Sequence, residues 1–265
     1  MIETFRNAWR VPELRKKLLF TFFIIIIYRV GGTVPVPYLD SVALSAWFEQ
    51  SASSGDFFSY LNVLSGGNFS KATLLALSVS PYINAQIIIQ LLTYALPPLE
   101  RLQKEGPEGR KKLNKITKYA SLAIAIFQAW AYYLTMKKAG ACVYTEGFSK
   151  IFAEIVIIAC FTAGASLTIW LGDEINEKGI GNGISMLLFA GIIARGPSAV
   201  IGLFDYMKTG EAKNIILVIA ILVVFILMIG FIIFMNEAER RIPIQYAKRV
   251  VGRKQYGGQN TFIPI

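Results

Sequence analysis

Residue types that carry out catalysis are scarce in this chain of 265 residues. It contains no histidine, which excludes any mechanism that needs an imidazole base, proton shuttle or metal ligand. Its two cysteines, Cys142 and Cys160, are too few for a disulfide framework and are not spaced as zinc ligands are. Cys160 falls within an apolar run, which is typical of a buried, unreactive thiol. We therefore expect no catalytic residue, no metal and no cofactor.

A glycine-rich segment, residues 172–185, superficially resembles a dinucleotide-binding loop. Such a loop follows a β-strand and opens a βαβ unit, whereas this segment follows a long apolar run that predicts a membrane helix. The chain also lacks the Gly-Lys-Ser/Thr sequence of a phosphate-binding loop, so we do not expect it to hydrolyse ATP. The glycines instead predict a tight, closely packed turn that enters the next helix.

The composition predicts the elements that position these residues. Hydrophobic residues make up 54% of the chain and charged residues only 17%, with a mean hydropathy of +0.51, whereas soluble domains carry about 25% charged residues. A helix needs about 20 mostly apolar residues to cross a bilayer. Six segments fit, namely residues 14–32, 72–97, 119–136, 151–171, 184–204 and 215–235. The predicted fold class is therefore an all-α, polytopic membrane protein.

The positive charge is concentrated on one side of this predicted topology. With the N-terminus inside, the segments expected in the cytoplasm hold 19 of the 27 Lys and Arg residues, and the external loops hold six. This bias predicts that the N-terminus is cytoplasmic. It leaves two interpretations of the basic loops, which either act only as topology signals that contact anionic lipid or also form a docking surface.

Two features interrupt the pattern of spans. Residues 55–67 are mostly apolar and aromatic but too few to cross a bilayer, which predicts a short helix ended by Gly66 and Gly67. That helix either lies on the membrane interface or dips into a cavity. The second span carries amides that include Asn84 and Gln90, which either form hydrogen bonds between packed helices or line an aqueous path.

Longer motifs occur in order along the whole chain. They are Arg-Val-Gly-Gly-Thr-Val-Pro-Val-Pro at 29–37, Leu-Ser-Gly-Gly at 64–67, Ser-Pro-Tyr-Ile-Asn-Ala-Gln-Ile-Ile-Ile-Gln-Leu-Leu at 80–92, Lys-Glu-Gly-Pro-Glu-Gly-Arg-Lys-Lys at 104–112, Glu-Lys-Gly-Ile-Gly-Asn-Gly-Ile-Ser at 177–185 and Glu-Arg-Arg-Ile-Pro-Ile-Gln-Tyr-Ala-Lys-Arg at 239–249. Together they resemble the SecY family, the channel subunit of the bacterial protein translocase.

The resemblance implies a larger architecture than six spans. Members of that family have ten spans in two inverted five-helix halves. Residues 1–205 are therefore expected to form the first half, including its plug at about 57–65. Residues 206–265 are expected to form the sixth span and a basic cytoplasmic loop. Because four spans are unaccounted for, the chain is expected to be a truncated, N-terminal portion of such a channel.

The resemblance also assigns roles to single residues. A plug that blocks the resting pore corresponds to Phe57, Phe58, Tyr60, Leu61, Val63 and Leu64, with its hinge at Gly66 and Gly67. A hydrophobic pore ring corresponds to Val79, Ile83, Ile184 and Leu188. A lateral gate, which parts to admit signal peptides, corresponds to Asn84 and Gln90. A cytoplasmic docking surface corresponds to Arg110, Lys111, Lys112, Arg240, Arg241, Lys248, Arg249, Arg253 and Lys254.

The function that the resemblance implies is a passive protein-conducting channel rather than an enzyme. Such a channel translocates unfolded preproteins across the bacterial inner membrane and inserts membrane proteins into it, driven by a motor or a ribosome. The expected partners are SecE and SecG subunits, the SecA motor ATPase, the ribosome through its rRNA, signal peptides, unfolded preproteins and membrane lipids. The expected location is the inner membrane, with several spans.

Two other classes of membrane protein are less consistent with the sequence. Secondary transporters share inverted repeats and broken helices, but ion-coupled ones usually place carboxylates at mid-membrane. Here the aspartates fall in loops, and Glu154 lies near a helix end. An intramembrane protease needs a serine–histidine pair or two aspartates at mid-membrane. The chain has neither.

Overall fold

The computed structural model describes residues 9–51, 57–144, 146–208, 212–239, 241–244, 249–251, 254–256 and 261–264. The chain divides into two compact units, Met1–Ser198 and Ala199–Ile265. The division falls within helix α10 (Gly196–Lys208). The first unit is built from helices, and the second contains helix followed by short paired strands.

Proline marks the start of several helices in the first unit. They are α2 (Pro12–Gly31), α3 (Ser41–Ser51), α4 (Phe57–Leu64), α5 (Ser80–Ala95), α6 (Pro97–Lys104), α7 (Pro107–Lys138), α8 (Gly147–Lys178) and α9 (Gly183–Ile193). Four of them, α2, α5, α6 and α7, carry proline in their first two positions. Proline suits the start of a helix because its fixed φ is already helical and its missing N–H would have no partner there.

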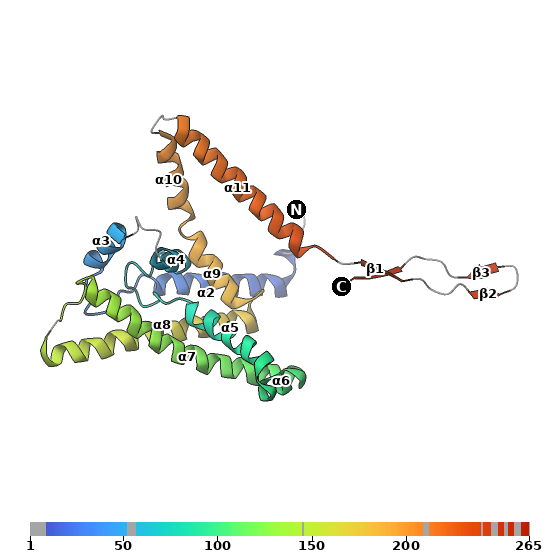
Figure 1. Ribbon diagram of the computed structural model, residues 1–265, viewed down its shortest axis with the longest axis horizontal. Coiled ribbons are helices and arrows are strands. Elements are labelled where there is room, and N and C mark those ends of the chain that lie inside the picture. Colours follow the sequence, from blue (N-terminus) through green and yellow to red (C-terminus); the bar gives the residue numbers. More distant parts are fainter. Residues whose placement is uncertain are drawn as a thin grey trace. The chain divides into compact units, whose positions relative to one another are not determined.

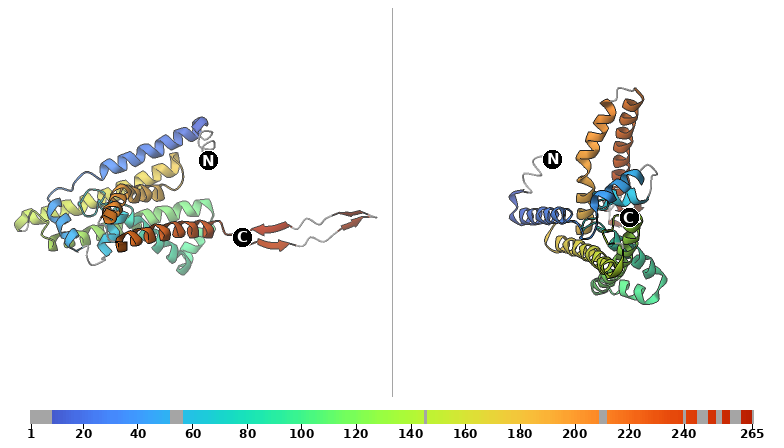
Figure 2. Two further views of the ribbon diagram at one scale, coloured as in Figure 1. Left: turned by 90° about the horizontal axis from the view of Figure 1, so that it is seen from above. Right: turned by 90° about the vertical axis from the view of Figure 1, so that its left-hand side faces the viewer.

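The helices of the first unit pack in sequence around a common interior. Helix α5 packs against α7, α7 against α8, and α8 against both α2 and α9 (Figures 1 and 2). An ion pair of 2.7 Å between Lys118 and Asp173 joins α7 to α8. The packing is close, because a methyl group on Gly164 of α8 would lie 1.8 Å from the carbonyl oxygen of Leu74. Only glycine allows the helix to approach the neighbouring backbone so closely.

Three helical stretches in the described residues are long and apolar enough by themselves to cross a membrane: Gly147–Lys178, Gly183–Lys208 and Lys213–Asn236. Helices α2, α5 and α7 lie where the other three spans were predicted. Together with the structural relatives reported below, these helices confirm the predicted class, a polytopic all-α membrane protein.

Two predicted spans are interrupted. The span predicted at residues 72–97 is α-helical only from Ser80 to Ala95, and the chain before it runs in turns, with positive φ at Ala72 (48°) and Ser78 (50°). The span predicted at residues 184–204 breaks between α9 and α10. The break has a local cause, since Pro197 lacks the N–H that would continue the helical hydrogen bonds.

The second unit ends in strands where the sequence predicted a basic loop. After α11 (Ala212–Asn236), β1 (Arg241–Ile244) pairs antiparallel with β4 (Thr261–Pro264), and β2 (Arg249–Val251) pairs with β3 (Lys254–Tyr256) (Figure 1). The outer strands are rich in Ile, Phe and Thr, which favour strands. The basic residues had obscured this pattern in the sequence.

Candidate functional site

A buried segment of irregular backbone lies at the centre of the first unit. Residues 65–79 connect α4 to α5, and most of them are buried although they form no α-helix. Buried amides and carbonyls outside a helix need partners within the protein, because no water is available at membrane depth. The chain after α2 supplies two of them, since Leu74 donates to the Val34 carbonyl at 2.8 Å and Val36 donates to the Ala72 carbonyl at 3.1 Å.

Two buried tyrosines hold the ends of this segment. The hydroxyl of Tyr132, on α7, donates to the carbonyl oxygen of Phe69, and the two rings stack with their centroids 4.2 Å apart. The hydroxyl of Tyr28, on α2, lies 2.8 Å from the hydroxyl of Ser78 in a hydrogen bond that either group can donate. Helices on two sides of the unit therefore fix the backbone immediately before α5.

The predicted plug precedes this segment, and the predicted hinge lies at the start of it. Gly66 and Gly67 follow α4 with φ of +69° and +90°, values that side-chain-bearing residues rarely adopt. A methyl group on Gly66 would lie 2.6 Å from the carbonyl oxygen of Gly191 on α9, whereas one on Gly67 would meet nothing within 4 Å. Gly66 therefore has two reasons to be glycine, and Gly67 has one. Asn62 links α4 forward, because its Oδ1 accepts from the Ser70 amide at 3.0 Å.

The side chains of the predicted plug are only partly described. Those of Phe57, Phe58 and Tyr60 lie outside the described residues, although their backbone is helical. Leu61 and Leu64 are half-buried, and Val63 is 45% exposed. The short helix thus presents one side to the protein and another to its surroundings.

A cavity of about 520 Å³ lies where α4 meets α5, α7 and α9. It brings together Leu61 and Leu64 from the predicted plug, Ile83 and Leu188 from the predicted ring, and Asn84 from the predicted gate. Its remaining lining residues are Phe69, Ala76, Leu77, Ser80, Ile87, Gln128, Ala131, Tyr132 and Thr135. Residues assigned to three roles from motifs far apart in the sequence therefore line one mostly apolar space.

The four predicted ring residues do not share one environment. Val79 is 1% exposed and packs with Tyr28, Leu75 and Leu187 in a buried cluster. Ile184 lies against α8, because a methyl group on Gly172 would be 2.6 Å from its Cδ1. Only Ile83 and Leu188, of the four, line the cavity.

The two residues of the predicted lateral gate lie in different places. Gln90 is exposed and does not line the cavity, whereas Asn84, also exposed, does. Helix α7 contributes three polar side chains to the cavity that were not predicted from the sequence, those of Gln128, Tyr132 and Thr135. Their polarity within an apolar span was the signal that could have found them.

The predicted docking residues fall in two places. Arg110, Lys111 and Lys112 are exposed near the start of α7, and Lys112 forms an ion pair of 3.3 Å with Glu105. Exposed pairs of this kind contribute little stability, so these charges are available to partners. Arg241, Arg249 and Lys254 lie in the strands of the second unit. Arg240, Lys248 and Arg253 lie outside the described residues.

The described part of the chain contains neither a cluster of metal ligands nor a thiol with a lowered pKa. It holds no group of three or more His, Cys, Asp or Glu residues that could bind a metal ion. Burial raises the pKa of the Cys142 thiol, located between α7 and α8, and Glu154 adds to this effect against the opposing charge of Lys137. A raised pKa keeps the thiol protonated and unreactive at neutral pH.

The fold and the site define a helical membrane protein with a short helix set over an internal cavity. The sequence model of the SecY family matches residues 73–265, and the chain belongs to that family. It is 40% identical over 275 residues to the protein translocase subunit SecY of Streptomyces coelicolor, and 40% identical over 271 residues to that of Aquifex aeolicus. In both comparisons all of this chain aligns, and it spans 62% of the relative's length.

Solved structures show the same fold. The chain resembles a structure described as a protein conducting channel, with a TM-score of 0.61 and 20% identity, over 95% of this chain and 52% of that one. A second matching structure is described as showing that the plug domain of the SecY protein stabilises the closed state of the translocation channel. That match has a TM-score of 0.63 and 21% identity, over 95% of this chain and 52% of that one.

The Tyr132 anchor can be tested by deleting one hydroxyl. Tyr132→Phe keeps the ring that stacks on Phe69 but removes the hydroxyl's hydrogen bond to the Phe69 carbonyl, which still accepts from the Ala72 amide at 3.2 Å. We expect a loss of about 0.5–2 kcal/mol and a lower midpoint of thermal unfolding in detergent. Tyr119→Phe is the matched control, because Tyr119 is an exposed residue of the same helix. Equal midpoints for the two variants would contradict the anchoring role.

Proposed function

We propose that this chain forms the N-terminal part of a protein-conducting channel that moves unfolded preproteins across the bacterial inner membrane and inserts membrane proteins into it. The observation that carries this proposal is the cavity shared by Leu61, Leu64, Ile83 and Leu188. It places a short, glycine-hinged helix against apolar side chains of two helices. The relatives named as translocase subunits support the same function. The channel is passive, and a partner supplies the energy.

The proposed seal is a narrow apolar constriction. Aliphatic side chains can exclude water from a narrow pore and so block ions without any charged gate. Ile83 and Leu188 are the members of the proposed ring that face the cavity. Val79 and Ile184 pack behind them in the same cluster of apolar residues. In this arrangement Val79 and Ile184 set the positions of the helices that carry the seal.

The proposed plug is α4, and the proposed hinge is Gly66 and Gly67. Closure is favoured by the fit of Gly66 against the Gly191 backbone and by the apolar contacts of Leu61 and Leu64. Asn62 and the two glycines supply local turns that keep the helix attached when those contacts break.

The proposed lateral gate is α5. Asn84 lines the cavity. Gln90 is exposed and lies nearly two turns further along α5. Ile87, Ile88 and Leu91 of this helix are exposed and apolar. Such a mixed surface suits a helix that contacts signal peptides on one side and lipid on another.

The proposed partners bind the basic surfaces. Arg110, Lys111 and Lys112, with the six basic residues of the region 240–254, would contact the SecA motor or ribosomal RNA through their charges. The SecE and SecG subunits and membrane lipids would contact the exposed apolar helix surfaces. The same charge distribution supports a cytoplasmic N-terminus.

The seal is tested by asparagine substitutions that differ only in position. Ile83→Asn and Leu188→Asn should fold nearly normally, because each amide faces the cavity and can be hydrated there. Both should raise the ion conductance of the resting full-length channel in planar bilayers, because they wet the constriction. Val79→Asn should instead reduce the yield of folded protein, since a buried amide without a partner costs about 1–3 kcal/mol. Destabilised Ile83 and Leu188 variants with no added leak would refute the seal.

The plug is tested by thiol labelling at two positions of α4. In a background with Cys142 and Cys160 replaced by serine, Leu61→Cys should react slowly at rest because its side chain faces the cavity. It should react faster when a preprotein is arrested in the channel. Val63→Cys is the matched control, since Val63 is already exposed at rest. Labelling of Leu61→Cys that does not change between the two states would favour a static interfacial helix.

A further inference from the structure

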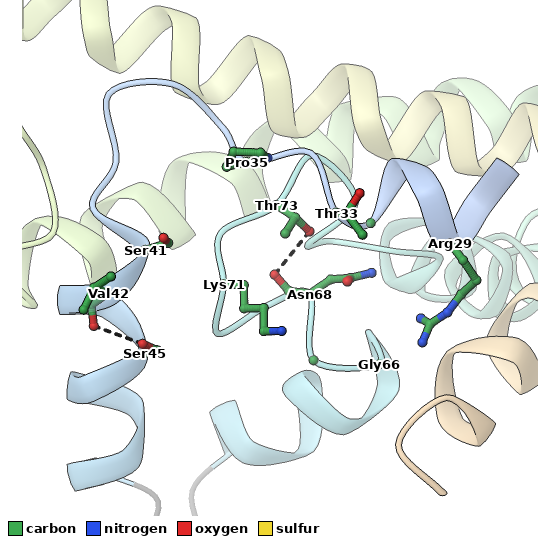
Figure 3. Close-up of a pocket in the computed structure, with 12 residues that line it drawn as sticks. Arg29, Thr33, Pro35, Ser41, Val42, Ser45, Gly66, Asn68, Lys71 and Thr73 are labelled. Carbon is green, nitrogen blue, oxygen red and sulfur yellow. Dashed lines mark hydrogen bonds between the residues drawn. The ribbon is translucent and has the colours of Figure 1, made fainter. Parts of the chain in front are cut away.

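A second, polar pocket of about 660 Å³ lies within the first unit, away from the apolar cavity described above. Its walls come from the end of α2, the start of α3, and the chain that follows α4 (Figure 3). Its size falls in the range of pockets that hold small molecules. Its lining includes Gly66 and Gly67, the proposed plug hinge.

The charged residues that line this pocket, among those that the structure describes, are positive. They are Arg29 and Lys71. Neither cation forms an ion pair within the part of the chain that the structure describes. Figure 3 shows their charged ends approaching the space beside Gly66 from opposite sides. Two unpaired cations facing one space favour an anion there.

A buried amide in the wall of the pocket lacks a partner. Asn68 is only 6% exposed, and its Nδ2 is buried without a hydrogen-bond acceptor. An unsatisfied buried donor is rare in proteins, because it costs free energy that an acceptor would recover. In Figure 3 this side chain lies between Lys71 and Arg29. Because Nδ2 is covered in this position, an acceptor in the pocket would satisfy it after the side chain turns toward the open space.

The backbone around the pocket leaves room for a ligand at this point. Arg29 closely approaches the plug hinge, since a methyl group on Gly66 would lie 3.1 Å from its Nη1. Gly67, which also lines the pocket, has open space where a side chain would be. Of the hydroxyls that line the pocket, those of Thr33 and Ser45 already donate to the carbonyls of Val30 and Val42, whereas that of Ser41 forms no such bond in the described part of the chain.

We propose that this pocket binds a phosphate group, either the headgroup phosphate of a phospholipid or free inorganic phosphate. Arg29 supplies a planar guanidinium that matches phosphate oxygens, and Lys71 supplies a point charge. Asn68 supplies a neutral donor once its side chain turns toward the ligand. The site shares Gly66 and Gly67 with the proposed plug hinge, but binding requires only that the first unit be folded.

The proposal is tested by ligand binding to the full-length protein in a neutral detergent. Native mass spectrometry measures retained dioleoylphosphatidylglycerol against dioleoylphosphatidylcholine, and calorimetry measures binding of inorganic phosphate. Arg29→Gln and Lys71→Gln should each weaken binding about tenfold or more, because charge-assisted hydrogen bonds are lost. Lys71 is exposed, so its variant should fold normally. The matched control is Lys138→Gln, which removes one exposed charge from the end of α7, outside the pocket.

The outcomes separate the ligand sources from a general charge effect. Retention of phosphatidylglycerol alone identifies a lipid site, and binding of inorganic phosphate that competes with the lipid identifies a phosphate site. Equal loss in Lys138→Gln would overturn the proposal, because the attraction would then belong to the whole surface. Binding of neither ligand by the wild-type protein would also overturn it. So would capture of a penta-glutamate peptide in preference to both, because the ligand class would then be carboxylate.

Discussion

The need to satisfy the buried backbone of residues 65–79 organises the first unit. The segment is buried outside any α-helix, and many of its amides donate within local turns, such as Ala72 to Phe69 and Ser78 to Leu75. Bonds from outside add to these turns. The chain at Val34–Val36 and Tyr132 on α7 pair with the backbone of the segment, and Tyr28 on α2 pairs with the Ser78 hydroxyl. We call helices α2 and α7, together with these hydrogen bonds to the segment, the frame.

The same constraint separates a fixed part of the site from a part that can move. The hydrogen bonds of the frame begin at Phe69 and extend to Ser78, just before α5. Helix α4 lies on the other side of Gly66 and Gly67 and contacts the rest through apolar side chains, the Gly191 backbone and the bond from Ser70 to Asn62. In the proposed mechanism, the plug leaves while the seal and the start of α5 keep their positions.

The sequence predicted the elements better than it predicted their packing. Apolar runs located α2, α7, α8 and α11, because a helix that contacts lipid needs little else. The interruption before Ser80 was not predicted, since residues 72–79 are as apolar as a span. Local hydrogen bonds close their turns, and the accompanying bonds to Val34 and Tyr28 join residues far apart in the sequence. The strands after α11 were missed for a related reason. Their basic residues are typical of a cytoplasmic loop, and pairing between distant residues is not visible in local composition.

For the candidate site, too, the sequence predicted residues better than it predicted how they pack. Family motifs identified Leu61, Ile83, Asn84 and Leu188, which do line one cavity. They could not separate Ile83 from Val79, four residues earlier, because both are aliphatic and lie on the same side of the chain in a helical pattern. Val79 in fact precedes the helix and is buried among Tyr28, Leu75 and Leu187. The polar pocket near Asn68 has no sequence signature, since its lining comes from three separate segments.

Hydrogen–deuterium exchange of the resting full-length protein tests the central claim most directly. If tertiary hydrogen bonds fix the buried segment and leave α4 free to move, the amides of Val36 and Leu74 should exchange slowly, at rates near those of α7 and α8. The amides of α4 should exchange much faster, although they are helical. Exchange across residues 69–79 as rapid as that of α4 would contradict the claim, because the segment would then open together with the plug.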